Sequence, residues 1–166
     1  YPFDAQLLDV ILSSDGIAFE IDFGDMEGIA YMQSQMTYTD GDMLSNHISA
    51  ELMGEVLEAF AKVGMTDREI LEQYRPWALA NEITALSMYY NPEGEDESTS
   101  APTVIDMFVY YKALENNIPV MQIESYQYQI DLFGALSDET LEEYLKSAVD
   151  AFNGVETEGE TYAESI

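Results

Sequence analysis

The chain has 166 residues, 47% of them hydrophobic, which is enough for one domain with a hydrophobic core. It carries 33 acidic residues against 5 basic ones, so its formal net charge of −28 repels nucleic acids and anionic membranes and attracts divalent cations and basic partners. The absence of cysteine excludes disulfides, thiolate metal sites and a cysteine nucleophile, and no apolar stretch is long enough for a membrane span.

The first predicted elements are a helix over 2–14, with Asp4 as its N-cap, and a strand over 17–23. Large apolar side chains occupy every second position of this strand, from Ile17 to Phe23. Glu20 and Asp22 lie between them, so both are expected on the opposite face, near the carboxyl end of the strand. Two carboxylates in this position are a candidate metal site or acid/base pair. The alternative is an edge strand whose acidic residues face water.

The stretch 24–46 is rich in Met, Gln, Thr and Asp and shows no sustained hydrophobic period, so its pattern assigns no particular element to it. Residues 40–51 partly match a calcium-binding loop, but the fifth position lacks an oxygen ligand and the sixth lacks glycine. A loop that leads into a helix is therefore the better interpretation. His47, the only histidine, lies in this loop and is interpreted as a surface or capping residue rather than a ligand.

Start and stop signals predict several helices in the middle of the chain. Ser49 caps a helix that runs to about residue 62 and ends at Gly64. Thr66 and Glu69 have the spacing of a capping box, which predicts that the next helix begins there.

Pro76 opens a further helix because proline fits the first helical position, and Trp77 is expected to fill the core or a groove. The stretch 91–102 is acidic, rich in serine and bounded by prolines, which predicts an exposed, flexible loop. Thr103 then caps a helix whose first turn contains Asp106, where the helix dipole favours an acid.

The segment 118–124 predicts a buried strand of a parallel sheet that ends at Glu124. A helix follows directly, so Glu124 lies at the edge where open α/β sheets bind ligands. The alternative is a turn carboxylate or a charge at the start of the helix. Ser137 caps the last helix, Gly154 ends it, and 155–166 reads as an acidic tail.

These elements predict an α/β fold that is rich in helices and has a small, mainly parallel sheet, because strands separated by helical crossovers run parallel. A buried parallel pair needs further strands beside it, so we expect the sheet to be incomplete in this chain. Unpaired strand edges would favour a homo-oligomer through strand exchange.

Several segments, taken in order, resemble the TraB/GumN family, which is related to the Tiki metalloproteases. The matching positions are Glu20, Asp22, Arg75, Pro76, Trp77, Asp106, Glu124 and Gln129. The resemblance covers 1–166, which would form the central part of a single TraB/GumN-like domain. One motif differs: Val104 replaces the glycine of the family's Gly-x-Asp element. The family's two Gly-x-x-His elements are not in this sequence. The chain begins with Tyr1 rather than methionine, so we expect upstream coding sequence or a removed leader.

The resemblance implies a metal-dependent hydrolase that acts on a peptide or protein. Glu20 would bind the divalent metal ion or act as the acid/base, and Glu124 would be a second acidic group. Because two imidazoles cannot be replaced by carboxylates without a change in metal preference, this chain alone is expected to be inactive. The acidic composition and the lack of cysteine fit an extracellular or surface-attached bacterial protein.

The alternative function is a non-enzymatic module that binds a peptide or a basic protein through acidic and aromatic surface. Its candidate aromatic residues occur in pairs, namely Tyr89 and Tyr90, Tyr110 and Tyr111, and Tyr126 and Tyr128. The competing interpretation is that these tyrosines pack inward, as aromatic residues commonly do.

Overall fold

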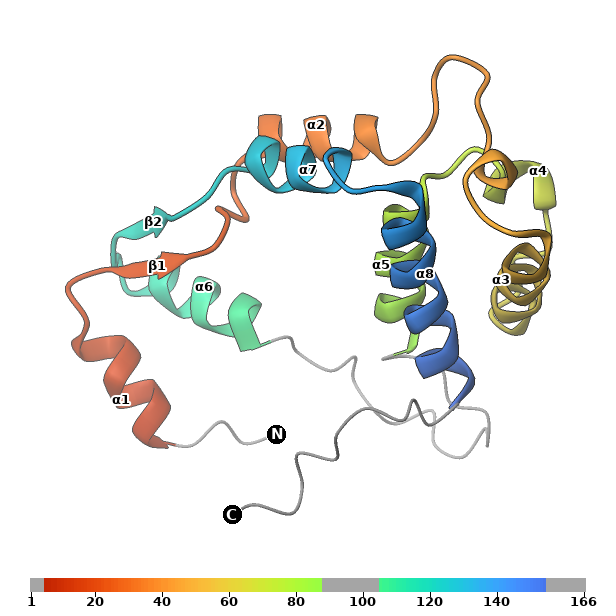
Figure 1. The fold of residues 1–166 in the computed structure, drawn as a ribbon. Coiled ribbons are helices and arrows are strands. Elements are labelled where there is room, and N and C mark those ends of the chain that lie inside the picture. The colour runs from red at the N-terminus through yellow and green to blue at the C-terminus, as the bar shows by residue number, and fades with distance from the viewer. Residues whose placement is uncertain (1–4, 88–104, 155–166) are drawn as a thin grey trace. The chain divides into compact units, whose positions relative to one another are not determined.

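The computed structural model describes residues 5–87 and 105–154 (Figure 1). These residues form two compact units, each described here by itself. The first unit contains 5–35 and 105–134, and the second contains 36–87 and 135–154. Several predicted features lie outside the described residues, namely Asp4, Tyr89, Tyr90, the loop 91–102, Thr103 and the tail 155–166.

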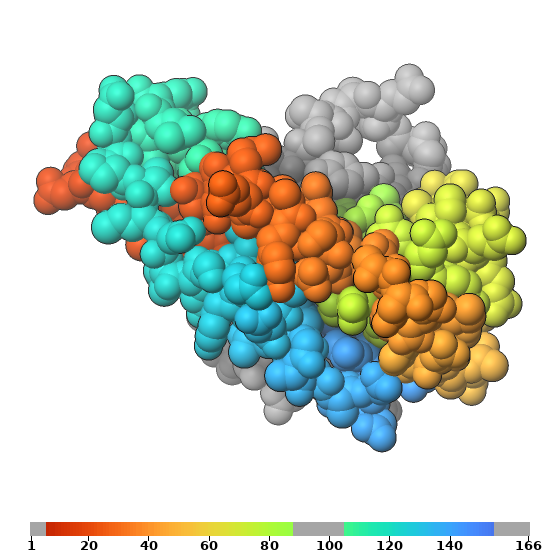
Figure 2. Space-filling view, turned by 90° about the horizontal axis from the view of Figure 1, so that it is seen from above, coloured from red at the N-terminus to blue at the C-terminus, as the bar shows by residue number. Residues whose placement is uncertain are grey.

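A two-stranded parallel sheet and four helices form the first unit. The elements are α1 (Ala5–Ser13), β1 (Ile17–Phe19), α2 (Met26–Gln35), α6 (Ile105–Glu115), β2 (Val120–Gln122) and α7 (Tyr126–Gly134). In the sheet, Ile17 lies opposite Val120 and Phe19 lies opposite Gln122, which confirms the predicted parallel pairing. Helix α1 packs against α6, and α2 packs along α7 (Figures 1 and 2).

Strand β1 ends earlier than expected because the chain turns directly after it. An oxygen of Asp22 accepts a hydrogen bond from the Gly24 N–H at 2.8 Å, and the Asp22 carbonyl accepts one from the Asp25 N–H at 3.0 Å. The Asp25 side chain then accepts from the Gly28 N–H at 2.9 Å, which caps the first turn of α2. The sequence pattern assigned no element to 24–46, whereas the structure forms α2 in this stretch. Helix α2 buries none of its residues, so its sequence carries no clear periodic signal.

Strand β2 is exposed, so the prediction of a buried strand is wrong. Met121 is 54% exposed and Ile123 is 72% exposed. Among the described residues, β2 has one neighbouring strand and one packed helix, α6, which leaves much of its surface open to water.

The core of the first unit is small and partly aromatic. Phe19, Phe23 and Tyr110 form a triad of edge-to-face rings, with centroids 5.4 to 5.8 Å apart. This triad joins β1 and the turn after it to α6.

The second unit is helical and has a larger core. It contains a short 3-10 helix (Leu44–Asn46), α3 (Ala50–Lys62), α4 (Arg68–Leu71), α5 (Pro76–Ser87) and α8 (Asp138–Asn153). Helix α8 packs against both α3 and α5 (Figure 1). The core contains Leu44, Ile48, Leu52, Met53, Val56, Ala59, Phe60, Leu71, Leu79, Ala80, Ile83, Leu145 and Val149.

Most predicted helix boundaries of this unit are confirmed. The hydroxyls of Ser49 and Ser137 accept hydrogen bonds from backbone N–H groups of the first turns of α3 and α8, each at 3.3 Å. Gly154 ends α8 in the left-handed conformation, with φ of 70°. The Thr66 capping box is wrong, because the N-cap of α4 is Asp67 and its side chain accepts from the Glu69 N–H.

No described helix combines the length and the apolar character that a membrane span requires.

Candidate active site at the carboxyl ends of β1 and β2

Two acidic residues come together where the parallel strands end. The Ile123 N–H donates to the Phe19 carbonyl at 2.9 Å, and the Glu124 N–H donates to the Glu20 carbonyl at 2.8 Å. Backbone pairing thus continues past β1 and β2 and places Glu20 and Glu124 side by side. Because the strands are parallel, both residues lie at the same edge of the sheet, where α/β proteins bind ligands.

A pocket of about 350 Å³ lies beside β1. It is lined by Ala18, Phe19, Glu20, Ile21, Phe23 and Asp106. Glu20 comes from the end of the strand, and Asp106 comes from the first turn of α6. Both carboxylates are exposed, so a ligand in the pocket can reach them. The structure therefore joins two of the sequence-predicted residues in one cavity.

Glu124 does not line this pocket, although its backbone is paired with Glu20. Its carboxylate is half-buried and accepts a long hydrogen bond from the Gln129 side chain, at 3.5 Å. The structure thus brings together Glu124 and Gln129, two positions of the sequence resemblance.

Asp22 is engaged in the turn after β1. Besides the Gly24 N–H, its Oδ1 accepts from the Tyr110 hydroxyl at 3.5 Å. Burial, together with the nearby Asp22 charge, raises the pKa of Tyr110 above its ordinary value. The expectation that Glu20 and Asp22 share a strand face is wrong, because β1 ends at Phe19 and the alternation stops there.

The donor atoms at this edge do not by themselves complete a metal site. Glu20 and Asp106 supply carboxylate oxygens, which suit hard divalent ions. Among the described residues, however, no three His, Cys, Asp or Glu side chains group closely enough to hold a metal ion. The described side chains therefore offer the type of ligand atom that such an ion prefers, but too few of them to hold it.

His47 lies in the second unit, between two carboxylates. Its Nε2 is 2.7 Å from Asp42 and its Nδ1 is 3.1 Å from Asp138, while its ring stacks on Tyr38 at a centroid distance of 5.0 Å. Burial opposes the charge of the imidazolium, but the hydrogen bonds to Asp42 and Asp138 outweigh it and raise the pKa of His47. Sequence reasoning missed this cluster because Asp138 is 91 residues away along the chain.

Asp42, the third position of the partial match to a calcium loop, is engaged within its own loop. The Asp42 oxygens accept hydrogen bonds from the Met43 N–H and the Asn46 side chain and pair with His47. These bonds lower the pKa of Asp42 to about 2, with the Asn46 bond as the largest cause. The carboxylate therefore holds the loop and the 3-10 helix together.

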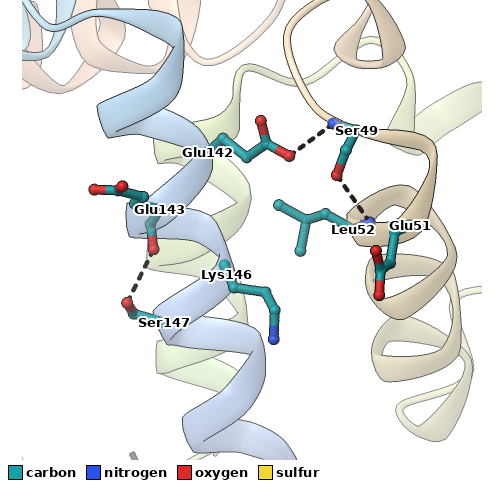
Figure 3. Close-up of a pocket in the computed structure, with 7 residues that line it drawn as sticks. All are labelled: Ser49, Glu51, Leu52, Glu142, Glu143, Lys146 and Ser147. Atoms are coloured by element: carbon teal, nitrogen blue, oxygen red, sulfur yellow. Dashed lines mark hydrogen bonds between the residues drawn. The ribbon is translucent and has the colours of Figure 1, made fainter. Parts of the chain in front are cut away.

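A larger pocket of about 550 Å³ lies between α3 and α8 (Figure 3). It is lined by Ser49, Glu51, Leu52, Glu142, Glu143, Lys146 and Ser147. Its central charged groups already join protein elements. Glu142 accepts from the Ser49 N–H at 2.8 Å, and Lys146 pairs with Asp150 at 2.5 Å and with Glu55 at 3.3 Å. We therefore interpret this pocket as a by-product of helix packing.

Pro76 and Trp77 are buried at the start of α5 in the second unit. This confirms a buried position for Trp77. Neither residue lines the pocket beside β1.

The model of the TraB/PrgY/gumN family matches residues 1–165. No curated protein and no solved structure matches the chain significantly.

Proposed function

The chain belongs to the TraB/PrgY/gumN family, and on that premise we propose that the pocket beside β1 is part of the site of a metal-dependent hydrolase acting on peptides or proteins. The observation that carries the proposal is the presence of Glu20 and Asp106 in one pocket at the carboxyl end of a parallel strand. Paired carboxylates in a cleft at this edge are suited to acid/base chemistry.

Glu20 is the proposed acid/base. Its side chain is exposed and makes no hydrogen bond or ion pair with another described residue, so its oxygens are available to substrate and water. In amide hydrolysis, the carboxylate accepts a proton from the attacking water and returns it to the leaving amine. Glu124 supports this position through the backbone bond between its N–H and the Glu20 carbonyl.

The hydrolase site is proposed to need donors beyond the described residues, because these provide no group of three metal ligands. The resemblance implies that Gly-x-x-His elements supply the imidazoles. Residues 1–166 expressed alone are therefore proposed to lack activity, and the protein expressed from its complete reading frame is the proper subject of the assay.

The test is peptide hydrolysis by that complete protein, measured by mass spectrometry with and without added divalent cations. We expect Glu20→Gln to lower the rate by about 100-fold or more, the usual contribution of a general acid/base. Glu82→Gln is the matched control, since Glu82 is exposed on α5 in the second unit. Undiminished hydrolysis by the Glu20 variant would refute the acid/base role. Equal activity of residues 1–166 alone would refute the need for further donors.

A second candidate, a non-enzymatic peptide-binding module, is favoured by exposed tyrosines of the first unit. Tyr111 is 55% exposed and Tyr128 is 53% exposed, whereas Tyr126 is 5% exposed and belongs to the core. Exposed aromatic side chains are common anchors of binding surfaces. Peptide-array binding by Tyr111→Ala and Tyr128→Ala variants tests this function. Binding that is indifferent to both substitutions would remove it.

A further inference from the structure

Carboxylates from two parts of the second unit hold His47 at both of its ring nitrogens. Its Nε2 lies 2.7 Å from Asp42 in the same loop, and its Nδ1 lies 3.1 Å from Asp138, the first residue of α8. A neutral imidazole has one N–H donor and one acceptor, whereas the protonated ring has two donors. Only the protonated ring can therefore donate to both carboxylates at once.

The two carboxylates differ in what else holds them. Asp42 also accepts from the Met43 N–H at 2.8 Å and from the Asn46 side chain at 2.7 Å, so its position does not depend on His47 alone. The Asp138 side chain is 64% exposed, and within the described residues its one hydrogen bond is the bond to His47.

Loss of the proton should therefore break the bond to Asp138 first. The neutral ring keeps its N–H on Nε2, toward the nearer and better-anchored Asp42. The lone pair of Nδ1 then faces the Asp138 carboxylate, and two acceptors repel each other.

The other groups around the ring leave the histidine as the titrating partner. Tyr38 stacks on it with an angle of 12° between the ring planes, and the Arg75 guanidinium lies 4.8 Å from the Tyr38 ring. Burial is the main reason that the pKa of Tyr38 rises to about 12, so the phenol stays neutral where histidine titrates. The charged groups that face this cluster are the Arg75 guanidinium and the carboxylates of Asp40, Asp42 and Asp138.

A second bond between the same parts of the unit does not involve His47. Glu142, in the second turn of α8, accepts from the Ser49 N–H at 2.8 Å. This bond lowers the pKa of Glu142, so the carboxylate stays charged where histidine titrates. Ser137 caps α8 by its own side chain. Release of Asp138 therefore leaves α3 joined to α8 and loosens only the residues that precede Ser49.

We propose that His47 forms a proton-dependent bridge, made of its bonds to Asp42 and Asp138, that fastens the segment 36–47 to the start of α8. The protonated ring closes the bridge, and loss of the proton opens it at Asp138. This opening is local and leaves the helices of the second unit packed.

The position of the bridge in the chain gives it a regulatory character. Residues 36–49 connect α2 to α3, and residues 135–137 connect α7 to α8. The bridge thus joins the two connections through which the chain passes from elements of the first unit to elements of the second. It contains none of the residues of the proposed hydrolase site, so neither proposal depends on the other.

The direction of the pH response follows from the contacts. Burial opposes the charge of the imidazolium, but the hydrogen bonds to both carboxylates outweigh it and raise the pKa of His47. The bridge is therefore closed in acid and opens above the pH at which a free histidine loses its proton.

The first test is an NMR titration of the imidazole in the complete protein. His47 is the only histidine of residues 1–166, and the loss of its signals in His47→Gln identifies them. We expect nitrogen chemical shifts to place the proton of the neutral ring on Nε2. Asp138→Asn should lower the proton affinity of the ring about two- to fivefold, the range for an exposed ion pair.

Glu139→Gln is the matched control. Glu139 is an exposed acid of the same turn of α8, and it makes no bond to the ring. Each of the two substitutions removes one negative charge from the start of this helix, where the helix dipole favours acids. Glu139→Gln should leave the titration of His47 almost unchanged, because solvent and salt screen its charge.

The second test is amide hydrogen exchange below and above the measured pKa of His47, with rates corrected for intrinsic pH dependence. The reporters are the N–H groups of Tyr38 and Leu44, which donate to the carbonyls of Gln73 and Glu72. Their protection should fall above the pKa by the same two- to fivefold factor, since proton binding and closure are linked. Protection within α5 and α8 should not change, and Asp138→Asn should remove the pH dependence of the two reporters.

Four results would overturn the proposal. Equal titration of His47 in wild type and Asp138→Asn would show that Asp138 does not hold the ring. A neutral ring with its proton on Nδ1 would place the opening at Asp42. Unchanged protection of the reporters across the titration would show that no segment opens, and an equal loss of protection within α8 would show that the whole unit unfolds. The last three measurements use the wild-type protein and need no variant to fold.

Discussion

The two units differ in how completely they bury their apolar side chains. The second unit has a continuous core in which Val56, Phe60 and Leu145 are fully buried. In the first unit, five apolar residues are buried: Ile11, Phe19, Ala113, Tyr126 and Ile130. Most of the large exposed apolar side chains among the described residues also belong to the first unit, with Val10, Met26 and Ile123 as the most exposed.

The unit with the larger core is therefore not the unit that contains the candidate site. Buried apolar area is the main favourable term in folding, so the helices of the second unit should hold most of the unfolding free energy. The candidate site belongs to the thinly packed unit, where the Glu20 carboxylate is exposed and open to ligands.

The largest expected effect comes from the core of the second unit. Phe60→Ala should lower the unfolding free energy by about 3 to 5 kcal/mol, because Phe60 is completely buried and its removal leaves a cavity. Ile130→Ala in the first unit should have a smaller effect, since Ile130 is 9% exposed and lies outside the large core cluster of the second unit. Urea denaturation followed by circular dichroism measures both. A larger loss for Ile130→Ala would reverse the comparison.

A pair of glycine substitutions tests the contact between α2 and α7. A β-carbon on Gly28 would lie 2.4 Å from a ring atom of Tyr126, whereas one on Gly54 in α3 meets no atom within 4 Å. Gly28→Ala should therefore destabilise the first unit by about 1 to 3 kcal/mol through overpacking. Gly54→Ala should stabilise the second unit by about 0.5 to 1 kcal/mol. Hydrogen exchange resolves the units, and unchanged protection in α7 of the Gly28 variant would contradict the close approach.

His47 makes the second unit sensitive to pH. Asp42 and Asp138 face its ring directly, and Tyr38 stacks on it with the Arg75 guanidinium 4.8 Å from the Tyr38 ring. The pKa of His47 is higher in the folded protein than in the unfolded chain, so protonation of this histidine stabilises the second unit. The stabilisation is complete at pH values below the pKa of the unfolded chain, and it is lost as pH rises through the pKa of the folded protein. The pKa of Asp42 is lower in the folded protein than in the unfolded chain, so its ionised carboxylate also stabilises the fold. This stabilisation is present at pH values above the pKa of the unfolded chain and is lost as pH falls toward about 2.

The corresponding experiment compares wild type and His47→Gln by urea denaturation at about pH 5.5 and about pH 8.5. The substitution should cost on the order of 1 kcal/mol more at the lower pH, where the imidazolium forms charged hydrogen bonds. Phe152 packs in the same unit away from this cluster, so a Phe152→Leu variant controls for general destabilisation. The same pH dependence in wild type and His47→Gln would contradict the role of the histidine.

The smallest effect tests the exposure of β2. Ile123→Thr should change the unfolding free energy by less than about 0.5 kcal/mol, because Ile123 is 72% exposed. Val149→Thr is the matched substitution in the second unit, where a hydroxyl enters a completely buried position and should cost about 1 to 3 kcal/mol. A large loss for Ile123→Thr would show that this side chain is covered in the protein in solution, which would sharpen the search for its partner.

The candidate site was partly predictable from the sequence. The positions of Glu20 and Glu124 at the ends of parallel strands follow from β-branched runs that helices separate. The strand predicted to end at Glu124 was expected to be buried, however, and the pattern assigned no element where α2 lies. Both results have one cause. Hydrophobic periodicity shows which side of a segment is buried when the core is complete, and the first unit buries few apolar side chains.

What the sequence by itself determined are the features that act over a few residues. Ser49, Ser137, Pro76 and Gly154 set helix boundaries because caps, proline and left-handed glycine act within one turn. Only the tertiary structure decided that Asp106 joins Glu20 in a pocket and that Asp138 meets His47. Side chains far apart along the chain meet according to how helices and strands pack, and no local pattern encodes that packing.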